Sequence, residues 1–558
     1  MENAFVNPNE INNTNEGFEK YDLSEFDKDT VLDEFKDLLN SVNVESLKTE
    51  LDEIDITNDD AFYSYQHEIL CKGYISVAFD EDLLRVTTIN GKCFNLFWDV
   101  ISYELIALIF KVHSPRKIIF NSIPFLKSFT SPVNSFYDIQ HIYKMFYEEK
   151  AENVLELVNK FTTTEINSVS LAMYYLIFIV KKVNGVIERN SLFSLVNKEF
   201  EILKIIANAE NKGLPFDENK FLKVVENIKT EYEKCKIHFS KNYDANYYSY
   251  ESIIQGLKSN NEMKIFNGDY FKKVKDPVRN NFYTTRLIYR DIVKTPLDYS
   301  KDRLFIKYDS CDDFMSISGN VNIKPLYDKF LVFNNNKRYI VASYYDLFYR
   351  IFAEASQIDY LIEYANDKKF IELLSKRIFA NTDLDKNHRE FYTDSFLQAL
   401  IRGFYKEDDI KLFFEDKLGF LVEKEEIIKI LKMIMSSCSD MIVFIDKFKK
   451  TYSAEKRRTS KDNMFIYNYI KLTEVDIIKD SILRAYHRIS SFNERNKYSI
   501  NIIGFVDNGF ILESDEGAFN IALDIANTTL TKSYDKYLKN TPASGYVKTK
   551  VNGLKLND

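Results

Sequence analysis

The sequence predicts a multidomain α+β protein in which an α/β domain precedes a longer region of helices and strands. The chain has 558 residues, enough for about three to four domains. Residues 70–195 mix short strands with helices, whereas residues 197–558 place a few strands among long helical segments. Hydrophobic residues make up 45% of the chain and charged residues 28%, which is ordinary for a globular protein.

The first 60 residues are predicted to form an acidic arm. They contain 18 Asp and Glu residues against 4 Lys, a net charge of −14, so residues 61–558 carry +5 of the total of −9. Residues 1–28 are rich in Asn and Glu and are expected to be disordered. Helical spacing of apolar residues over 31–42 predicts an amphipathic helix that either packs on the body or binds a partner such as a replication protein. The arm could also occupy a basic groove and compete with DNA.

The α/β region begins with strands that alternate with tight-turn residues. Strands are predicted at Tyr74–Phe79, Leu84–Ile89, Cys93–Leu96 and Lys117–Asn121. A helix is predicted at Ser102–Val112, and further helices continue to about residue 196.

Cysteine usage and hydropathy indicate the compartment. The five cysteines lie far apart without a C-x-x-C pair, which argues against a disulfide framework and a zinc site. No basic-then-apolar leader opens the sequence, and its longest uncharged run, Ile166–Val180, is too short to span a bilayer. We therefore expect a cytoplasmic protein, or one in the host cytoplasm if it is viral.

The second half is predicted to be mainly helical around a few strands. Residues 197–260 are helical apart from a break at Gly213–Pro215, and a strand follows at Arg338–Ser343. Residues 346–490 are helical again. A strand pair at Ser499–Val506 and Phe510–Glu513 and a last strand near 545–551 complete the chain.

Several segments resemble, in the same order, the motifs of family A (Klenow-like) DNA polymerases. The segment EFEILKIIANAENKGLPFD resembles the entry to the thumb, and RLIYRDIVKTPLDY a Tyr-Arg helix beyond it. The segment YIVASYYDLFYRIFAEAS resembles a palm strand and helix, TEVDIIKDSILRAY a second palm helix, and NIIGFVDNGFILES the palm hairpin. The matching residues are Glu199, Glu210, Gly213, Asp217, Tyr289, Arg290, Lys294, Tyr299, Ala342, Tyr344, Arg350, Thr473, Asp476, Ile477, Ile478, Lys479, Val506, Phe510, Ile511, Leu512 and Glu513.

This resemblance implies a right-hand polymerase fold preceded by an RNase H-like domain. Residues 61–196 would be a degenerate 3′–5′ exonuclease-like domain, residues 197–310 a thumb-like helical domain and residues 311–558 the palm and fingers. In the first of these domains Asn121 matches the family pattern, but Leu126 stands where an aspartate is expected.

The sequence departs from the family where the chemistry takes place. Two-metal phosphoryl transfer uses two carboxylates to hold its Mg²⁺ ions. The positions matching these two aspartates are Ser343 and Asn508, and Phe348 and Gly509 replace the accompanying glutamates. Neutral side chains hold Mg²⁺ poorly. The resemblance therefore implies an inactive polymerase homologue, a pseudoenzyme without a metal cofactor.

The fingers helix departs from the family in the same way. Anchored on Gly403, its phosphate- and base-contacting positions read Glu390, Asp394, Gln398 and Arg402. Two phosphate-binding cations have thus become acids, which repel a triphosphate. A register that starts at His388 instead places Tyr392 at the lysine position. The template-side Thr-Gly-Arg motif reads Ser318-Gly319-Asn320.

Two basic clusters are the candidate DNA-binding residues, since Lys and Arg contacts to phosphate supply most non-specific affinity. An ordinary solvated surface is the alternative interpretation of each. The first cluster, between predicted thumb helices, contains Lys272, Lys273, Lys275 and Arg279. The second contains Lys447, Lys449, Lys450, Lys456, Arg457, Arg458 and Lys461.

Three hypotheses follow for the function. The first is a non-catalytic factor that binds primer–template DNA, duplex DNA or a protein in the replication of a phage, plasmid or mobile element. The second is an active polymerase whose Mg²⁺ site has moved to Asp346 or Asp507. The third is a protein-interaction scaffold that no longer binds DNA.

Overall fold

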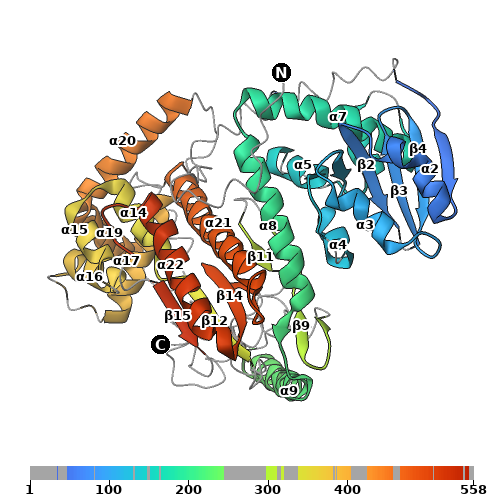
Figure 1. Ribbon diagram of the computed structural model, residues 1–558. Coiled ribbons are helices and arrows are strands. Elements are labelled where there is room, and N and C mark those ends of the chain that lie inside the picture. Colours follow the sequence, from blue (N-terminus) through green and yellow to red (C-terminus); the bar gives the residue numbers. More distant parts are fainter. Residues whose placement is uncertain are drawn as a thin grey trace. The chain divides into compact units, whose positions relative to one another are not determined.

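The structure is a computed structural model whose chain divides into two compact units, Met1–Leu203 and Lys204–Asp558 (Figure 1). It describes residues 34, 47–80, 82–129, 132–147, 151–162, 165–243, 297–310, 316–319, 337–367, 369–380, 382, 384, 386–403, 424–456, 465–506, 508–543 and 547–551. The finer division into four domains stays a prediction.

Unit 1 is built on a six-stranded mixed sheet of order β1-β4-β3-β2-β5-β6. The middle strands β4, β3 and β2 run antiparallel, β5 and β6 continue the sheet parallel to β2, and β1 adds to the other edge parallel to β4. The strands are β1 (Asp52–Ile56), β2 (Tyr74–Phe79), β3 (Leu83–Thr88), β4 (Lys92–Phe97), β5 (Arg116–Ile119) and β6 (Phe136–Asp138).

Helices surround this sheet, and the longest of them, α7 (Val169–Arg189), packs against β2, β3 and β5. By length and apolar content α7 could cross a membrane, but 72% of its most apolar stretch is buried inside the protein, as in a core helix. The other helices are α2 (Asp59–Ile69), α3 (Tyr103–Lys111), α4 (Ser122–Ser128), α5 (Ile139–Tyr147) and α6 (Val154–Phe161); α8 (Phe193–Lys212) continues across the division between the units.

Two strands of this sheet differ from the sequence expectation. Strand β1 lies inside the acidic arm assigned to residues 1–60, so the folded body starts before residue 61. Strand β6 lies where only helices were expected, and it is three residues long. Of the amphipathic segment 31–42, only Glu34 is among the described residues. It is helical, and its carboxylate accepts a hydrogen bond of 3.0 Å from Arg189.

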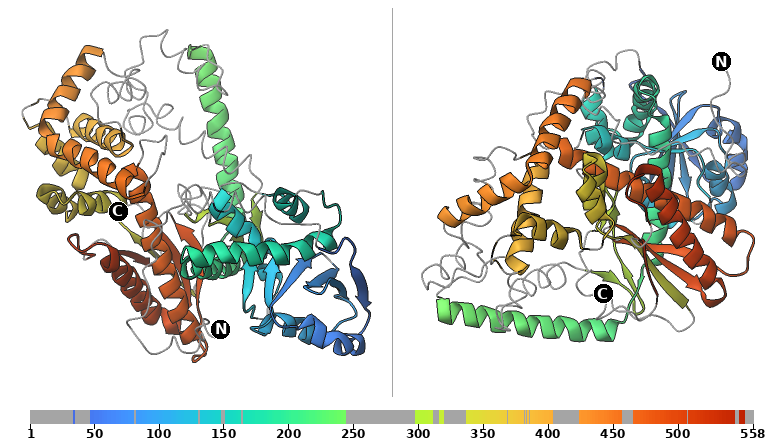
Figure 2. Two further views of the ribbon diagram at one scale, coloured as in Figure 1. Left: turned by 90° about the horizontal axis from the view of Figure 1, so that it is seen from above. Right: turned by 90° about the vertical axis from the view of Figure 1, so that its left-hand side faces the viewer.

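Unit 2 is centred on a four-stranded antiparallel sheet of order β13-β14-β12-β15. It contains the expected hairpin and last strand: β13 (Ile500–Val506), β14 (Gly509–Asp515) and β15 (Val547–Val551), beside β12 (Lys337–Tyr344). Two long helices, α21 (Phe465–Asn493) and α22 (Phe519–Tyr537), pack against each other and against this sheet (Figure 2). A short helical turn, η6 (Glu516–Ala518), leads from β14 into α22.

A small ribbon of three strands and a separate pair of strands follow α8 in the chain. Strand β7 (Leu214–Pro215) pairs with β9 (Arg303–Phe305), which pairs with β8 (Asp298–Tyr299), and β10 (Tyr308–Asp309) pairs with β11 (Ser318–Gly319). The 26-residue helix α9 (Glu218–Tyr243) begins just after β7.

Six further helices of unit 2 lie within its described residues. Helix α14 packs on α15 and α21, and α16 packs on α17 and α19. The helices are α14 (Leu347–Ser356), α15 (Asp359–Ala365), α16 (Phe370–Ile378), α17 (Lys386–Ile401), α19 (Lys424–Ser437) and α20 (Ser439–Lys456).

Candidate functional site

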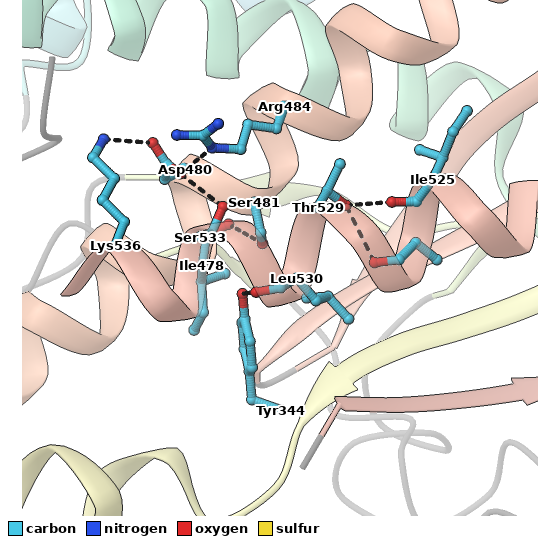
Figure 3. Close-up of polar contacts among 11 residues, drawn as sticks. Tyr344, Ile478, Asp480, Ser481, Arg484, Ile525, Thr529, Leu530, Ser533 and Lys536 are labelled. Atoms are coloured by element: carbon cyan, nitrogen blue, oxygen red, sulfur yellow. Dashed lines mark hydrogen bonds and ion pairs between the residues drawn. The ribbon is translucent and has the colours of Figure 1, made fainter. Parts of the chain in front are cut away.

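One buried polar cluster joins α21 to α22 beneath the sheet of unit 2 (Figure 3). The Asp480 carboxylate accepts hydrogen bonds from Arg484 Nε at 2.6 Å, Ser533 Oγ at 2.7 Å and Lys536 Nζ at 3.1 Å. Burial raises the pKa of Asp480, but the bonds from Arg484 and Ser533 outweigh it and hold the pKa below its usual value. Asp480 is therefore an ionised structural acid between two cations. We call these four residues the Asp480 cluster.

Motif residues of the palm strand and helix are part of the same packing. Alternate side chains of β12 point to opposite faces, and Tyr344 points toward α22, where its hydroxyl donates to Leu530 O at 2.8 Å. Arg350 of α14 is 1% exposed; its Nη1 donates to Ala365 O at 2.8 Å and its Nε to the Tyr534 hydroxyl. Both matched residues thus have structural partners.

The thumb-entry motif also has a structural explanation. Glu210 of α8 accepts a 2.8 Å hydrogen bond from the Tyr308 backbone N–H. Gly213 ends α8 at φ +64°, a left-handed conformation that glycine adopts without strain. Arg303 donates to Gly213 O at 3.2 Å and to Glu513 of β14 at 2.7 Å, which ties the ribbon to the sheet.

The positions expected to hold the metal carboxylates meet at one end of β12. Ser343 pairs with Gly509 across the β12–β14 ladder, and the Tyr344 backbone N–H donates to Asn508 O at 3.0 Å. We call Ser343, Asn508 and Gly509 the palm centre. The structure brings these three predicted positions side by side, and each of their side chains is neutral.

Gly509 approaches β12 too closely for any side chain. A Cβ atom at this position would lie 1.9 Å from Ala342 O and 2.7 Å from Ser343 Cα. Both neighbours are backbone atoms, so neither can rotate away. A glutamate at this position would require β14 to shift away from β12.

A cavity of about 360 Å³ opens beside the palm centre. It is lined by residues from the start of α14, the end of α17, the start of α21 and the β13–β14 turn: Asp346, Leu347, Phe348, Tyr349, Gln398, Arg402, Tyr467 and Asn508. Its volume lies in the range typical of small-ligand sites. The predicted positions Phe348 and Asn508 and the rescue candidate Asp346 therefore share one cavity.

Asp394, one of the two acids predicted at phosphate-contacting positions, lies on α17 and is hydrogen-bonded to its neighbours. Asp394 accepts hydrogen bonds from the Tyr349 hydroxyl and from Gln398 Nε2, the latter at 2.8 Å. Burial raises the pKa of Tyr349 above its usual value, and the Asp394 charge adds to this shift. Arg402 lies with its guanidinium carbon 5.6 Å from the centre of the Tyr467 ring. Glu390 forms a 3.5 Å ion pair with Lys386 one helical turn away.

A pair of Mg²⁺ ions does not fit the described residues of the palm centre. Asp346 is the one carboxylate among the described residues lining the cavity, and Ser343 and Asn508 offer neutral oxygens. Within the described ranges, no group of three or more His, Cys, Asp or Glu side chains could hold a metal ion. Asp507 lies outside the described residues. Two-ion catalysis requires carboxylates shared between the metals.

Four of the eleven candidate DNA-binding cations lie within the described residues. Lys447 lies in the middle of α20 and is exposed, and Lys449, Lys450 and Lys456 belong to the last turns of this helix. The other candidates of both clusters, Lys272, Lys273, Lys275, Arg279, Arg457, Arg458 and Lys461, lie outside the described residues, as do the matched residues Tyr289, Arg290 and Lys294. The assignment of these cations to DNA stays a prediction.

Unit 1 contains a buried polar cluster that the sequence analysis missed. Asp138, at the end of β6, accepts hydrogen bonds from the backbone N–H groups of Ser122 at 2.7 Å and His141 at 2.8 Å. Burial raises the pKa of Asp138 to about 6. His141 Nε2 lies 3.1 Å from a Glu199 carboxylate oxygen, with both side chains buried. The sequence signal for this cluster was Asp138, which follows the apolar residues Phe136 and Tyr137 directly before a helix. The two motif positions considered there, Asn121 and Leu126, lie at the cap and within α4.

Comparisons with known proteins identify the fold. No family model matches the sequence, and no curated protein is significantly similar to it. Among solved structures, the chain is similar to the "POL domain of Pol1 from M. smegmatis complex with DNA primer-template and dNTP", with a TM-score of 0.69 and 13% identity. The match covers 89% of this chain and 98% of that chain. The predicted fold, that of a family A polymerase domain, is thereby confirmed.

Proposed function

We propose that this chain is a non-catalytic homologue of family A DNA polymerases that binds DNA, or a protein partner, during replication of a phage, plasmid or other mobile element. It acts in the cytoplasm, or in the host cytoplasm if the element is viral. The observation that carries the proposal is the palm centre, where a hydroxyl, an amide and a glycine replace the carboxylates of the polymerase reaction.

The geometry of the palm centre supports the loss of catalysis beyond the missing charges. The fold around it is intact, since β12, β14, α21 and α22 pack as one body. At Gly509, however, the backbone of β12 occupies the space that a side chain would need. An intact fold with neutral residues at the palm centre is expected of a protein that binds a ligand through this fold but does not catalyse a reaction.

Two observations support DNA as the ligand. The similar solved structure is described as a complex with a DNA primer-template, and its likeness to this chain extends over 89% of the residues. Residues 61–558 carry a net charge of +5, and three cations lie in the last turns of α20. Binding through phosphate contacts requires no metal ion.

Unit 1 serves as an exonuclease-like structural domain in this proposal. Three antiparallel strands extended by two parallel ones, β4-β3-β2-β5-β6, agree with the RNase H-like expectation. Unit 2 makes up less than two thirds of the chain, so a match over 89% of it includes much of unit 1. The cluster around Asp138 then stabilises the edge of this sheet.

One observation favours a second candidate, an active polymerase with a relocated metal site. Asp346 lines the same cavity as Asn508, and it has a left-handed backbone with φ 50°, which is uncommon for a residue other than glycine. In this case the protein extends a primer with Mg²⁺ or Mn²⁺, and Asp346→Ala abolishes extension while Asp359→Ala, at the start of α15, leaves it unchanged.

A binding assay run beside an extension assay tests the proposal. Fluorescence anisotropy with a labelled primer–template is measured at 50 mM and 200 mM salt. The same DNA is incubated with all four dNTPs and Mg²⁺ or Mn²⁺, with an active family A polymerase as positive control. We expect salt-sensitive binding and no extended product. Extension by even a few nucleotides contradicts the non-catalytic assignment. Absence of binding at both salt concentrations identifies the scaffold that does not bind DNA.

A further inference from the structure

The cavity beside the palm centre has walls suited to a flat aromatic ligand. Phe348, Tyr349 and Tyr467 contribute three aromatic rings to its lining. The Phe348 ring centre lies 5.7 Å from that of Tyr349 and 6.2 Å from that of Tyr467, so the rings form a continuous patch from α14 to α21. Aromatic faces of this kind stack on nucleobases of any sequence.

The charges of the lining nearly cancel. Among its described residues, Arg402 carries the one positive charge and Asp346 the one negative charge, while Gln398 and Asn508 add neutral amides. Asp394 lies one helical turn before Gln398 and is bonded to it. The Lys471 ammonium lies 5.4 Å from the centre of the Phe348 ring, but it is paired with Glu474 at 2.7 Å. A triphosphate brings several negative charges toward Asp346 and Asp394, whereas a nucleotide within a strand brings a single phosphodiester charge, which one guanidinium can match.

We propose that this cavity binds one unpaired nucleobase of a DNA strand without a divalent ion, with Tyr467 stacking on the base and Arg402 contacting its phosphate. The inference rests on the proposed DNA binding and specifies its ligand. It differs from a nucleotide-addition site because it disfavours free triphosphates. The amides of Gln398 and Asn508 supply donors and acceptors for the edge of the base.

The experiment uses the full chain and two DNA hairpins, one with a blunt end and one that ends in a single unpaired 2-aminopurine. Stacking on an aromatic ring quenches 2-aminopurine fluorescence. In EDTA, we expect quenching on binding and tighter binding of the overhang hairpin. Tyr467→Leu weakens binding of the overhang by about tenfold and leaves blunt-end affinity unchanged. Arg402→Ala does the same, whereas the control Arg389→Ala, on the same helix but outside the cavity lining, acts equally on both hairpins.

Three results would overturn the inference while leaving DNA binding intact: quenching that requires Mg²⁺, equal effects of Arg402→Ala and Arg389→Ala, or displacement of the overhang by micromolar dNTP. Failure to bind either hairpin would contradict the proposed DNA binding, on which this inference rests. Tyr467→Phe, which keeps the ring, is expected to preserve quenching. It therefore separates loss of stacking from loss of folding, and thermal melting of each variant confirms that the protein is folded.

Discussion

The Asp480 cluster and the palm centre belong to the same packed body, yet they differ in how their charges are balanced. Asp480 keeps its carboxylate between Arg484 and Lys536, and it is 4% exposed. The palm centre has Ser343 and Asn508 where carboxylates were expected. Losing an acid bonded to largely buried cations removes the charge that balances them, which destabilises the fold. An acid whose partner is a metal ion taken from solution can be replaced without harm to the fold.

The largest expected effect is on the Asp480 cluster. Asp480→Ala should lower the free energy of unfolding by about 3–5 kcal/mol, because it leaves two largely buried cations without their acid. Urea denaturation followed by far-UV circular dichroism measures this. The control is Asp524→Ala on α22, whose ion pair with Arg488 is exposed and should contribute at most about 1 kcal/mol. If Asp480→Ala does not fold, Asp480→Asn supplies the comparison. Equal effects of the Asp480 and Asp524 variants would refute the distinction.

The next effect extends the comparison to Asp138, a buried acid whose hydrogen bonds come from backbone N–H groups. The pKa of Asp138 is raised to about 6 in the folded state, against about 3.9 in an unfolded chain. Ionisation is therefore disfavoured by folding, and stability falls as pH rises from about 4 to 6. Between pH 4 and 7 the wild type should lose up to about 3 kcal/mol relative to Asp138→Asn. The fluorescence of Trp98, the one tryptophan of the chain, reports unfolding of unit 1. Parallel pH profiles for the two proteins would show that Asp138 does not titrate there.

The smallest expected effect concerns the palm centre. Gly509→Ala should destabilise the protein by about 1–3 kcal/mol, because the added methyl group meets the backbone of β12. Ser343→Ala, at its ladder partner, removes a half-buried hydroxyl and should change stability by less than about 0.5 kcal/mol. Urea denaturation of both variants measures the difference. A neutral Gly509→Ala would mean that β14 can move away from β12.

The sequence predicted the elements of the sheets and helices best where their signals were local. The hairpin around Asn508 has a tight-turn Asn-Gly pair between two apolar runs, the helix of Thr473 to Lys479 carries a matching motif, and both are present. Strand β1 was missed because acids fill its exposed positions and it pairs at an edge. Strand β6 was missed because three residues carry no readable period.

The palm-centre positions followed from motif matching, but their surroundings did not. The cavity draws its lining from four separate elements, so no single window of sequence contains it. The bonding of Asp394 to Tyr349 and Gln398 depends on how α14 packs near α17. The closeness of Gly509 to Ala342 depends on the β12–β14 register, which a single-strand pattern cannot give.

The short distance between Gly509 and β12 limits which side chains the palm centre can acquire by mutation. An asparagine codon becomes an aspartate codon by one nucleotide change, so position 508 could gain a negative charge in a single step. Two of the four glycine codons mutate to a glutamate codon by one change as well, but the resulting side chain at position 509 would collide with the main chain of the neighbouring strand. A carboxylate is therefore open to position 508 by point mutation, whereas one at position 509 would also require the hairpin to rearrange.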